Sequence, residues 1–395
     1  MRILCLTPWF PPYPGAQSGN FILDSVEALH AQGHEVKVVV TQAWHPGWGG
    51  LLHPDWGRPR LRSELHDPAL GLDVLTYPSI PRNYLRNISA WLFKRWLQPP
   101  LEMTIRKYQP DVLLVHTEQA AAVATLAGAT TGVPVVVVLH GINTSAGLNT
   151  IAEHARVRTT LCSAKRVVLV GEPLWQHFSD IAGSTENFRI VHNGFKFPPS
   201  DLVKTDLCWP STVRFISVSN LAVGKGIDLN LRAFAKLYRE GQCNWTYTIV
   251  GAGSELHSLQ TLAGESGIAE LVHFAGAVDH TAVYGLLAGA DVFVLPSWRE
   301  AFGVAWLEAM ACGLLAVAVQ GQGPATFITH EKTGLLVAPK DVADLAACLH
   351  RILDEPALMQ RLAQKGRESV QRDFTWTAHA TKLAAVCAEV TGINT

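Results

Sequence analysis

Charged side chains are scarce in this sequence of 395 residues, where Asp, Glu, Lys and Arg together make up 16%. Typical soluble domains carry about 25%. Hydrophobic residues make up 48% of the chain, which excludes an intrinsically disordered protein. The 32 Lys and Arg nearly balance the 33 Asp and Glu, so the formal net charge is −1. Because a neutral chain has no global field for a polyanion, we expect no nucleic-acid partner, although small local anion sites fit this charge.

Long apolar runs and paired cysteines are missing as well. No apolar stretch approaches the ~18 residues of a membrane-spanning helix, and the apolar stretch Ile3–Leu6 is too short for a secretory signal. The seven cysteines are scattered and include no Cys-x-x-Cys pair, which favours reduced thiols over disulfides. We therefore expect a cytoplasmic protein.

Motifs of several enzyme classes are absent too. The sixteen histidines include no His-Glu-x-x-His or other compact ligand pattern. The Gly-x-Ser-x-Gly motif of α/β-hydrolases is also missing. We therefore expect neither a bound metal nor a cofactor.

Short β-branched runs alternate with longer helix-like stretches along the whole chain. Several runs are apolar on both faces, which is typical of parallel strands covered by helices on both sides. The strand candidates are Ile3–Leu6, Val36–Thr41, Val74–Tyr77, Val112–Val115, Pro134–Leu139, Val167–Val170, Arg189–Val191, Val213–Val218, Tyr247–Val250, Val272–Phe274, Val292–Leu295, Leu315–Val319 and Leu335–Val337. This alternation predicts an α/β protein with Rossmann-like, doubly wound parallel sheets.

The alternation weakens once, near the middle of the chain. The stretch from Phe195 to Pro210 is rich in proline and has no clear period, so we expect a linker there. We therefore divide the chain into an N-terminal domain over residues 1–197 and a C-terminal domain over 198–374. The last segment, 375–395, has a helical pattern, and we expect it to pack back on the N-terminal domain.

The strongest motif follows a strand of the second domain. Glu300 is expected in a strand-to-helix loop, with the helix beginning near Phe302. The backbone N–H groups of Phe302, Gly303 and Val304 would then point at an anion from a positive helix end. Glu308 follows about 9 Å along the helix, at 1.5 Å per residue. Two carboxylates around an anion site fit the hydroxyls on either side of a diphosphate.

This motif resembles the Glu-x7-Glu motif of the retaining, nucleotide-sugar-dependent glycosyltransferases of family 4. The following residues, Met310–Gly313, are similar to that family's continuation. The resemblance implies a GT-B fold, in which two Rossmann-like doubly wound domains face a cleft. It also implies that Glu300 contacts the donor sugar and that Glu308 holds the ribose.

Three further segments of the second domain match donor-binding segments of that family. Lys225, in a glycine-flanked loop before a helix, would bind the donor diphosphate. Asn220 stands where many members have Arg, so one positive charge is lost. Gly251 and Gly253 form a Gly-x-Gly turn beside the donor, which by itself is more often a plain tight turn. The segment around Val278 would contact the base through its backbone.

The first domain contributes a histidine and a glycine-preceded helix. His140 ends a buried strand, where open α/β sheets bind ligands. The resemblance gives it a hydrogen bond to the donor sugar, whereas a lone histidine is more often structural. Gly19 and Asn20 end a proline-rich loop before a helix, and the resemblance implies contact with acceptor and donor phosphate. Two acids that relatives carry are absent here, with Ile142–Asn143 and Ala325–Thr326 in their places.

The segment 83–108 interleaves basic residues with Trp91, Phe93 and Trp96. Such a helix fits an anionic membrane surface. A packed helix with a solvated face fits equally well. A peripheral contact with the inner face of the membrane is thus one of two interpretations.

Taken together, the resemblance predicts glycosyl transfer from a nucleoside-diphosphate sugar to an acceptor hydroxyl with retention at the anomeric carbon. The acceptor would be a sugar or a lipid-linked glycan, in polysaccharide or glycolipid assembly. His140, Lys225 and Glu300 are the predicted catalytic residues. Two alternatives remain: a nucleotide-sugar-binding protein without turnover, suggested by Asn220, and a sugar-phosphate-type synthase on the same fold.

Overall fold

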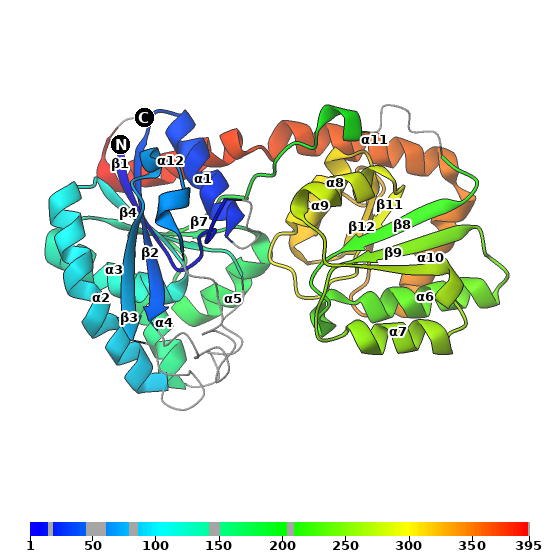
Figure 1. Cartoon of the computed structure of the whole chain (residues 1–395), viewed down its shortest axis with the longest axis horizontal. Helices are drawn as coiled ribbons and strands as arrows, with labels where there is room; N and C mark the ends of the chain where they lie inside the picture. The colour runs from blue at the N-terminus through cyan, green and yellow to red at the C-terminus, as the bar shows by residue number, and fades with distance from the viewer. Residues whose placement is uncertain (15–18, 45–60, 79–85, 142–150, 204–208, 394–395) are drawn as a thin grey trace. The chain divides into compact units, whose positions relative to one another are not determined.

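The computed structural model describes residues 1–14, 19–44, 61–78, 86–141, 151–203 and 209–393. The chain forms two compact units (Figure 1). The N-terminal unit comprises Met1–Val170, Leu174–Asn193 and Trp376–Thr395, and the C-terminal unit comprises Gly171–Pro173 and Gly194–Thr375. The main chain thus passes from one unit to the other at Gly194, a few residues before the predicted boundary.

The shift of this boundary has a local cause at Phe195. Its N–H donates to the carbonyl of Phe374 at 3.2 Å, and the residue forms a parallel β-bridge with Thr375. Its side chain is buried. Phe195 is therefore part of the C-terminal unit. Residues 204–208 of the proposed linker lie outside the described part of the chain.

The N-terminal unit is built on a parallel sheet with the strand order β3-β2-β1-β4-β5-β6-β7. Its strands are β1 (Arg2–Thr7), β2 (Glu35–Trp44), β3 (Asp73–Pro78), β4 (Val112–His116), β5 (Val135–Leu139), β6 (Arg166–Leu169) and β7 (Phe188–Ile190). Every residue of β4 and β5 is buried. Runs such as Val-Val-Val-Val-Leu form these central strands because helices cover both faces of the sheet.

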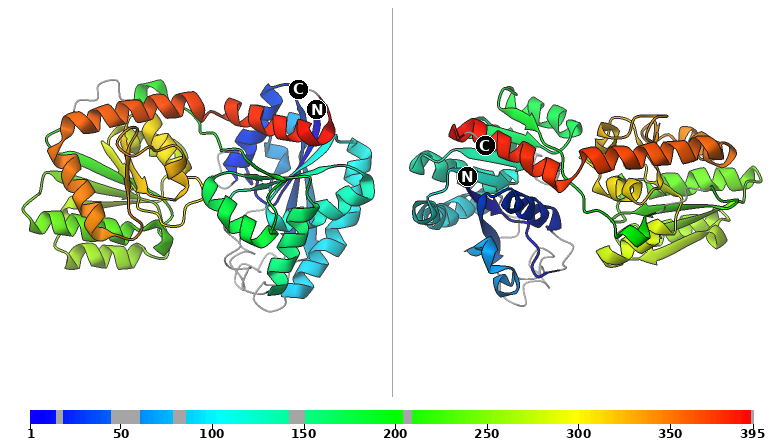
Figure 2. Two further views of the ribbon diagram at one scale, coloured as in Figure 1. Left: turned by 180° about the vertical axis from the view of Figure 1, so that it is seen from behind. Right: turned by 90° about the horizontal axis from the view of Figure 1, so that it is seen from above.

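The helices of this unit are α1 (Asn20–Ala31), α2 (Arg86–Tyr108), α3 (Glu118–Thr131), α4 (Ile151–Ser163), α5 (Glu172–Ala182) and the C-terminal α12 (Trp376–Thr391). Helix α12 packs on α1 (Figure 2). His379 Nε2 lies 2.8 Å from Ser25 Oγ. Near its end, Glu389 accepts from Arg166 Nε at 2.7 Å and Arg189 Nη2 at 2.9 Å. These contacts tie the end of the chain to the first sheet.

The C-terminal unit repeats the design with the order β10-β9-β8-β11-β12-β13. Its strands are β8 (Val213–Val218), β9 (Trp245–Val250), β10 (Val272–Gly276), β11 (Val292–Val294), β12 (Leu315–Val319) and β13 (Leu335–Val337). Its helices are α6 (Ile227–Arg239), α7 (Leu256–Glu265), α8 (His280–Ala288), α9 (Val304–Ala311), α10 (Val342–Asp354) and α11 (Pro356–Asp373). Helices α6, α7 and α10 cover one face of the sheet, and α8, α9 and α11 cover the other (Figure 1).

All the strand candidates are observed, so the predicted class of two doubly wound parallel sheets is confirmed. The strand order reverses between β1 and β4 in one sheet and between β8 and β11 in the other. In open α/β sheets, ligands bind at such switch points, outside the carboxyl ends of the strands. These two places are therefore where site residues are to be sought.

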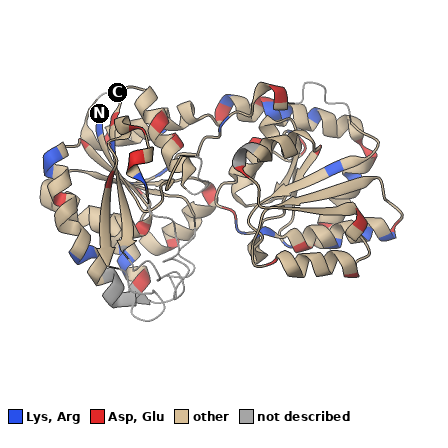
Figure 3. Ribbon diagram, in the orientation of Figure 1, with Lys and Arg blue, Asp and Glu red and all other residues tan. Residues whose placement is uncertain are grey.

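The low charge content follows from this architecture. The strands of both sheets carry few charged side chains (Figure 3). Most Lys, Arg, Asp and Glu residues lie on helices and loops, where positive and negative charges are interspersed. Among the described residues, no helix is long and apolar enough to cross a membrane.

Candidate active site

The switch point of the C-terminal sheet brings two predicted residues into contact. Lys225 follows β8 and Glu300 follows β11, and these strands are neighbours in the sheet. Lys225 Nζ donates to Glu300 Oε2 at 2.8 Å, and the side chains are 23% and 16% exposed. The two residues belong to separate sequence motifs, so the sheet order, and no local pattern, makes this ion pair.

The loop that carries Lys225 is tightly packed on the loop after β11. Lys225 ends a short 3₁₀ turn, and Gly226 with φ +70° opens α6. A Cβ on Gly226 would lie 2.4 Å from a carbonyl oxygen of the facing loop. The carbonyl of Gly224 accepts from the N–H of Trp298 at 3.1 Å and from Ser297 Oγ at 3.2 Å. These backbone contacts fix the direction from which Lys225 approaches Glu300.

Glu300 is held from its other side by the loop after β12. Its N–H donates to Gln322 Oε1 at 3.1 Å, and its carbonyl accepts from the N–H of Gly323 at 2.9 Å. Gln322 was not among the predicted site residues, although glycines flank it on both sides. In the same loop Thr326, which stands where relatives carry an acid, donates to Glu172.

The predicted start of helix α9 is wrong by two residues. The helix begins at Val304, and Gly303, in the left-handed conformation with φ +102°, is its N-cap. Phe302 precedes the cap, and its buried ring packs on the rings of Phe327 and Phe374. Glu308 lies on α9 and is 8% exposed. The side chain of Phe302 is thus a packing residue of this loop. The donor-binding roles of the Phe302 backbone and of Gly303, Val304 and Glu308 stay predictions.

The Gly-x-Gly turn after β9 has a structural reason of its own. A Cβ on Gly251 would lie 1.8 Å from the carbonyl oxygen of Ser219, and one on Gly253 would lie 2.2 Å from that of Leu221. The glycines therefore allow the loops after β9 and β8 to touch each other. Asn220 lies exposed between those two contacts. Val278, half-buried, follows β10 at the same carboxyl edge.

Beside the switch point of the N-terminal sheet, at the ends of β4 and β5, His140 meets a second histidine. His116 ends β4 and His140 follows β5, and His116 Nδ1 lies 2.8 Å from His140 Nε2. The two rings stack with centroids 5.1 Å apart. The sequence analysis missed His116, although it occupies the same strand-end position as His140. Within the described residues, His140 Nδ1 has no hydrogen-bond partner.

Burial keeps both imidazoles neutral. It lowers the pKa of His116 to about 3, and a smaller contribution comes from the charge of His379. It also lowers the pKa of His140 well below the usual value, with the charge of His116 adding to the effect. A neutral His140 can donate or accept a hydrogen bond, but it is not an acid at neutral pH.

The start of α1 lies against this histidine pair. Gly19, with φ +86°, is the N-cap of α1, and a Cβ there would lie 2.8 Å from the backbone of Phe10. Asn20 is the first helical residue, and the ring of the next residue, Phe21, lies 4.7 Å from that of His140. The structure thus brings Gly19 and Asn20 close to His140. Residues 15–18 of this loop, and Ile142–Asn143, lie outside the described residues.

Comparison with known proteins places this geometry in a family. The family model "Glycosyltransferase Family 4" matches residues 18–196, and "Glycosyl transferases group 1" matches residues 211–369. The chain belongs to the family 4-type glycosyltransferases. It is 27% identical to the glycogen synthase of Mycobacterium tuberculosis over 98% of this chain and 94% of that one.

Solved structures of this glycosyltransferase's fold include two that match nearly the whole chain. Sucrose-phosphate synthase from Thermosynechococcus elongatus has a TM-score of 0.79 at 22% identity, covering 99% of this chain and 100% of that one. HepE from Anabaena, solved in complex with UDP, has a TM-score of 0.73 at 20% identity, covering 98% and 100%. These likenesses confirm the predicted GT-B type of fold.

Proposed function

We propose that this protein is a retaining glycosyltransferase that moves a sugar from a nucleoside-diphosphate sugar to an acceptor hydroxyl, in polysaccharide or glycolipid assembly. The observation that carries the proposal is the Lys225–Glu300 ion pair at the switch point of the C-terminal sheet. Similarity to a glycogen synthase supports a polysaccharide product, and the UDP bound to HepE supports a nucleotide donor.

Lys225 and Glu300 suit the two ends of such a donor. The ammonium group of Lys225 would neutralise the diphosphate as it leaves. The carboxylate of Glu300 would accept hydrogen bonds from the sugar hydroxyls, and Glu308 would hold the ribose. Asn220, Gly251, Gly253, Val278 and the backbone from Phe302 to Val304 complete the proposed donor site. Since Lys225 supplies the cation, we propose that no metal or other cofactor is needed.

Retention points to a front-face displacement. The rings of His116 and Phe21 lie against His140. The segment 133–150 around it carries no Asp or Glu that could serve as the nucleophile of a double displacement. The bond from the anomeric carbon to the phosphate oxygen breaks, and a bond to the acceptor oxygen forms on the same face. The acceptor's proton passes to the departing phosphate oxygen. His140 would donate a hydrogen bond to the donor sugar. Gly19 and Asn20 would contact the acceptor and the donor phosphate.

The test is release of nucleoside diphosphate from UDP-, GDP- and ADP-sugars with a panel of sugar and lipid-linked acceptors, in the presence of EDTA. Glu300→Ala should lower turnover by about 10²-fold or more, since one preorganised polar contact in a transition state supplies that much. Glu355→Ala, which removes another carboxylate paired with a cation of the same unit, is the matched control. The configuration of the product at its anomeric carbon reports retention. Equal activity of both variants would refute the site assignment.

Two other outcomes correspond to the alternatives. Donor binding without release in every acceptor mixture would favour a binding protein, as the missing positive charge at Asn220 suggests. A phosphorylated sugar as the best acceptor would favour a synthase, which the fold shared with sucrose-phosphate synthase makes worth including.

We also propose a cytoplasmic protein that contacts the membrane peripherally through the segment 83–108. Residues 83–85 lie outside the described chain, and the remainder forms most of α2. Phe93 is buried, while Trp91 and Trp96 are 61% and 56% exposed. One face of α2 thus packs, and the exposed indole rings of the other face support the proposed membrane contact.

A further inference from the structure

The hydrogen bond between the two imidazoles of the N-terminal sheet has a direction. His116 Nδ1 lies 2.8 Å from His140 Nε2, so one of these nitrogens carries the proton and the other accepts it. A neutral imidazole has one N–H and one lone pair on its two nitrogens. The direction of this bond therefore decides which nitrogen of His140 is protonated and what the ring offers to a ligand.

Each ring has a second nitrogen that this bond does not use. Within the described residues, neither His116 Nε2 nor His140 Nδ1 has a hydrogen-bond partner, and both atoms are buried. The two side chains differ in their surroundings, because His116 is 1% exposed whereas His140 is partly exposed at the carboxyl edge of the sheet. A ligand can therefore approach His140 but not His116.

The cost of an unpaired N–H group favours one direction. Unpaired N–H groups are rarer in protein interiors than unpaired acceptors. If His140 donated the bond, the remaining N–H would be His116 Nε2–H, enclosed in the core. If His116 donates, the remaining N–H is His140 Nδ1–H, which a ligand oxygen can accept. The second arrangement leaves no N–H without a partner once a ligand is bound.

The third buried histidine of this region, His379, already uses both of its ring nitrogens. Its Nδ1 lies 2.8 Å from the carbonyl oxygen of His192, which can only accept, so this nitrogen carries the proton. Its Nε2, 2.8 Å from Ser25 Oγ, then accepts from that hydroxyl. These two bonds leave His379 no nitrogen for His116.

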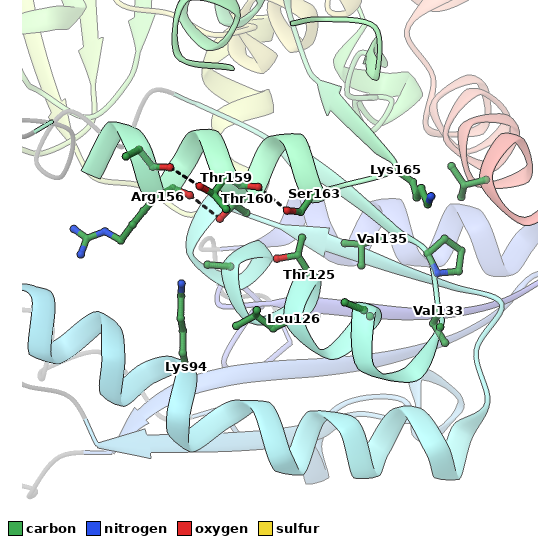
Figure 4. A pocket seen from close by; sticks show the side chains of 17 residues that line it. Lys94, Thr125, Leu126, Val133, Val135, Arg156, Thr159, Thr160, Ser163 and Lys165 are labelled. Atoms are coloured by element: carbon green, nitrogen blue, oxygen red, sulfur yellow. Dashed lines mark hydrogen bonds between the residues drawn. The ribbon is translucent and has the colours of Figure 1, made fainter. Parts of the chain in front are cut away.

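The groove beside α3 and α4 does not supply a partner either. It has a volume of about 750 Å³, and its lining includes Gly128, Val133 and Val135, where β5 begins (Figure 4). Neither His116 nor His140 is among the described residues that line it. His140 follows the opposite end of β5. A partner for His140 Nδ1 must therefore come from the carboxyl edge of the sheet.

We propose that His116 is a positioning residue of the glycosyl transfer, whose Nδ1–H donates to His140 Nε2 and thereby holds the proton of His140 on Nδ1 for the donor sugar. The rings on either partner fix the orientation of the imidazole, since the centroid of Phe21 lies 4.7 Å and that of His116 5.1 Å from the centroid of His140. The role in turnover rests on the proposed function, whereas the tautomer of His140 does not.

The first test reads the tautomer directly. Nitrogen NMR of the full chain, isotope-labelled in its histidines, tells a protonated ring nitrogen from a bare one, and His140→Gln identifies the signals of His140. We expect the proton on Nδ1 in the unchanged chain and in His116→Asn, whose amide can donate from the place of the imidazole Nδ1. In His116→Leu the proton should be free to occupy either nitrogen. A proton on Nε2 in the unchanged chain would overturn the proposal.

The second test asks whether His116 acts through His140. His116→Leu should lower turnover about tenfold, as His140→Gln does, because the hydrogen bond to the donor sugar is weakened in both. The double variant should match His140→Gln alone within about twofold. His116→Asn should retain most of the turnover. Affinity for the nucleoside diphosphate of the best donor should stay unchanged, since its proposed site lies in the C-terminal unit.

The matched control is His30→Leu, which removes an imidazole of α1 whose Nε2 is likewise buried and without a partner in the described residues. It should leave turnover and the tautomer of His140 unchanged. Losses that multiply in the double variant of His116 and His140 would give His116 a merely structural role and refute the inference. The unchanged chain and His116→Asn decide the tautomer even where His116→Leu fails to fold. Absence of turnover with every donor would refute the proposed reaction, and the NMR measurement would still decide the tautomer.

Discussion

The two sheets have the same topology around their switch points, but the carboxyl ends of their central strands carry different chemistry. Beside β8 and β11 stands a charged pair, Lys225 and Glu300, at 2.8 Å. Beside β4 and β5 stand two neutral imidazoles, His116 and His140, also 2.8 Å apart. The topology thus sets where a site forms, and the residues at the strand ends set what it binds.

The loops differ as much as the side chains. In the C-terminal unit, several glycines let the backbones of neighbouring loops approach each other more closely than a residue with a Cβ would allow. The ion pair is therefore held before a donor arrives, which lowers the cost of organising the site on binding. In the N-terminal unit, burial of the side chains rather than backbone packing sets the protonation state of the two histidines.

The largest expected effect comes from removing the cation at the C-terminal sheet, Lys225, compared with removing the imidazole at the N-terminal sheet, His140. Lys225→Met should lower turnover by about 10²- to 10³-fold, because the charge it neutralises grows as the diphosphate leaves. His140→Gln should cost about tenfold, since an amide can still hydrogen-bond to the sugar. Steady-state rates with the best donor measure both. A greater loss of turnover for His140→Gln than for Lys225→Met would show that the imidazole contributes more to the reaction than the cation does.

The next effect concerns the glycines. Gly251→Ala should lower the free energy of unfolding by about 3 kcal/mol, since its Cβ would meet the carbonyl of Ser219 and its φ is +137°. Gly33→Ala is the matched control, because its φ is +82° but nothing lies within 4 Å of the added Cβ. There the cost should be about 1 kcal/mol. Urea denaturation compares the two, and equal costs would show that the loops after β8 and β9 yield easily.

The smallest effect near neutral pH is a pH dependence of stability. Because burial lowers the pKa of His116 in the folded chain to about 3 from its ordinary value of 6.5, the unfolded chain binds more protons between these two pH values. Stability due to His116 is thus complete above pH 6.5 and falls as pH drops toward 3, by up to about 1.4 kcal/mol per pH unit. His116→Asn should flatten this fall in melting temperature. His257→Asn, at an exposed position of α7, should leave it unchanged.

The strands could be predicted because continuous apolar runs have no other stable place than a sheet buried on both faces. Lys225 and Glu300 could be predicted as site candidates because each lies in a strand-to-helix loop that resembles a donor-binding segment of the family. His140 could be predicted because it is a polar residue at the end of a buried strand. Gln322 and His116 could not, since each gains its importance from a partner on a different strand. The start of α9 was misplaced because the left-handed Gly303 ends the loop later than the pattern suggests.

The sequence by itself determined the two doubly wound units, the loop and strand-end candidates and the net charge near zero. Those features depend on local apolar runs and on the amino-acid composition, which are the same whatever the fold. Only the tertiary structure decided that Lys225 meets Glu300 and that His116 meets His140. Such contacts join residues far apart in the chain, and the order of strands and the packing of helices bring them together.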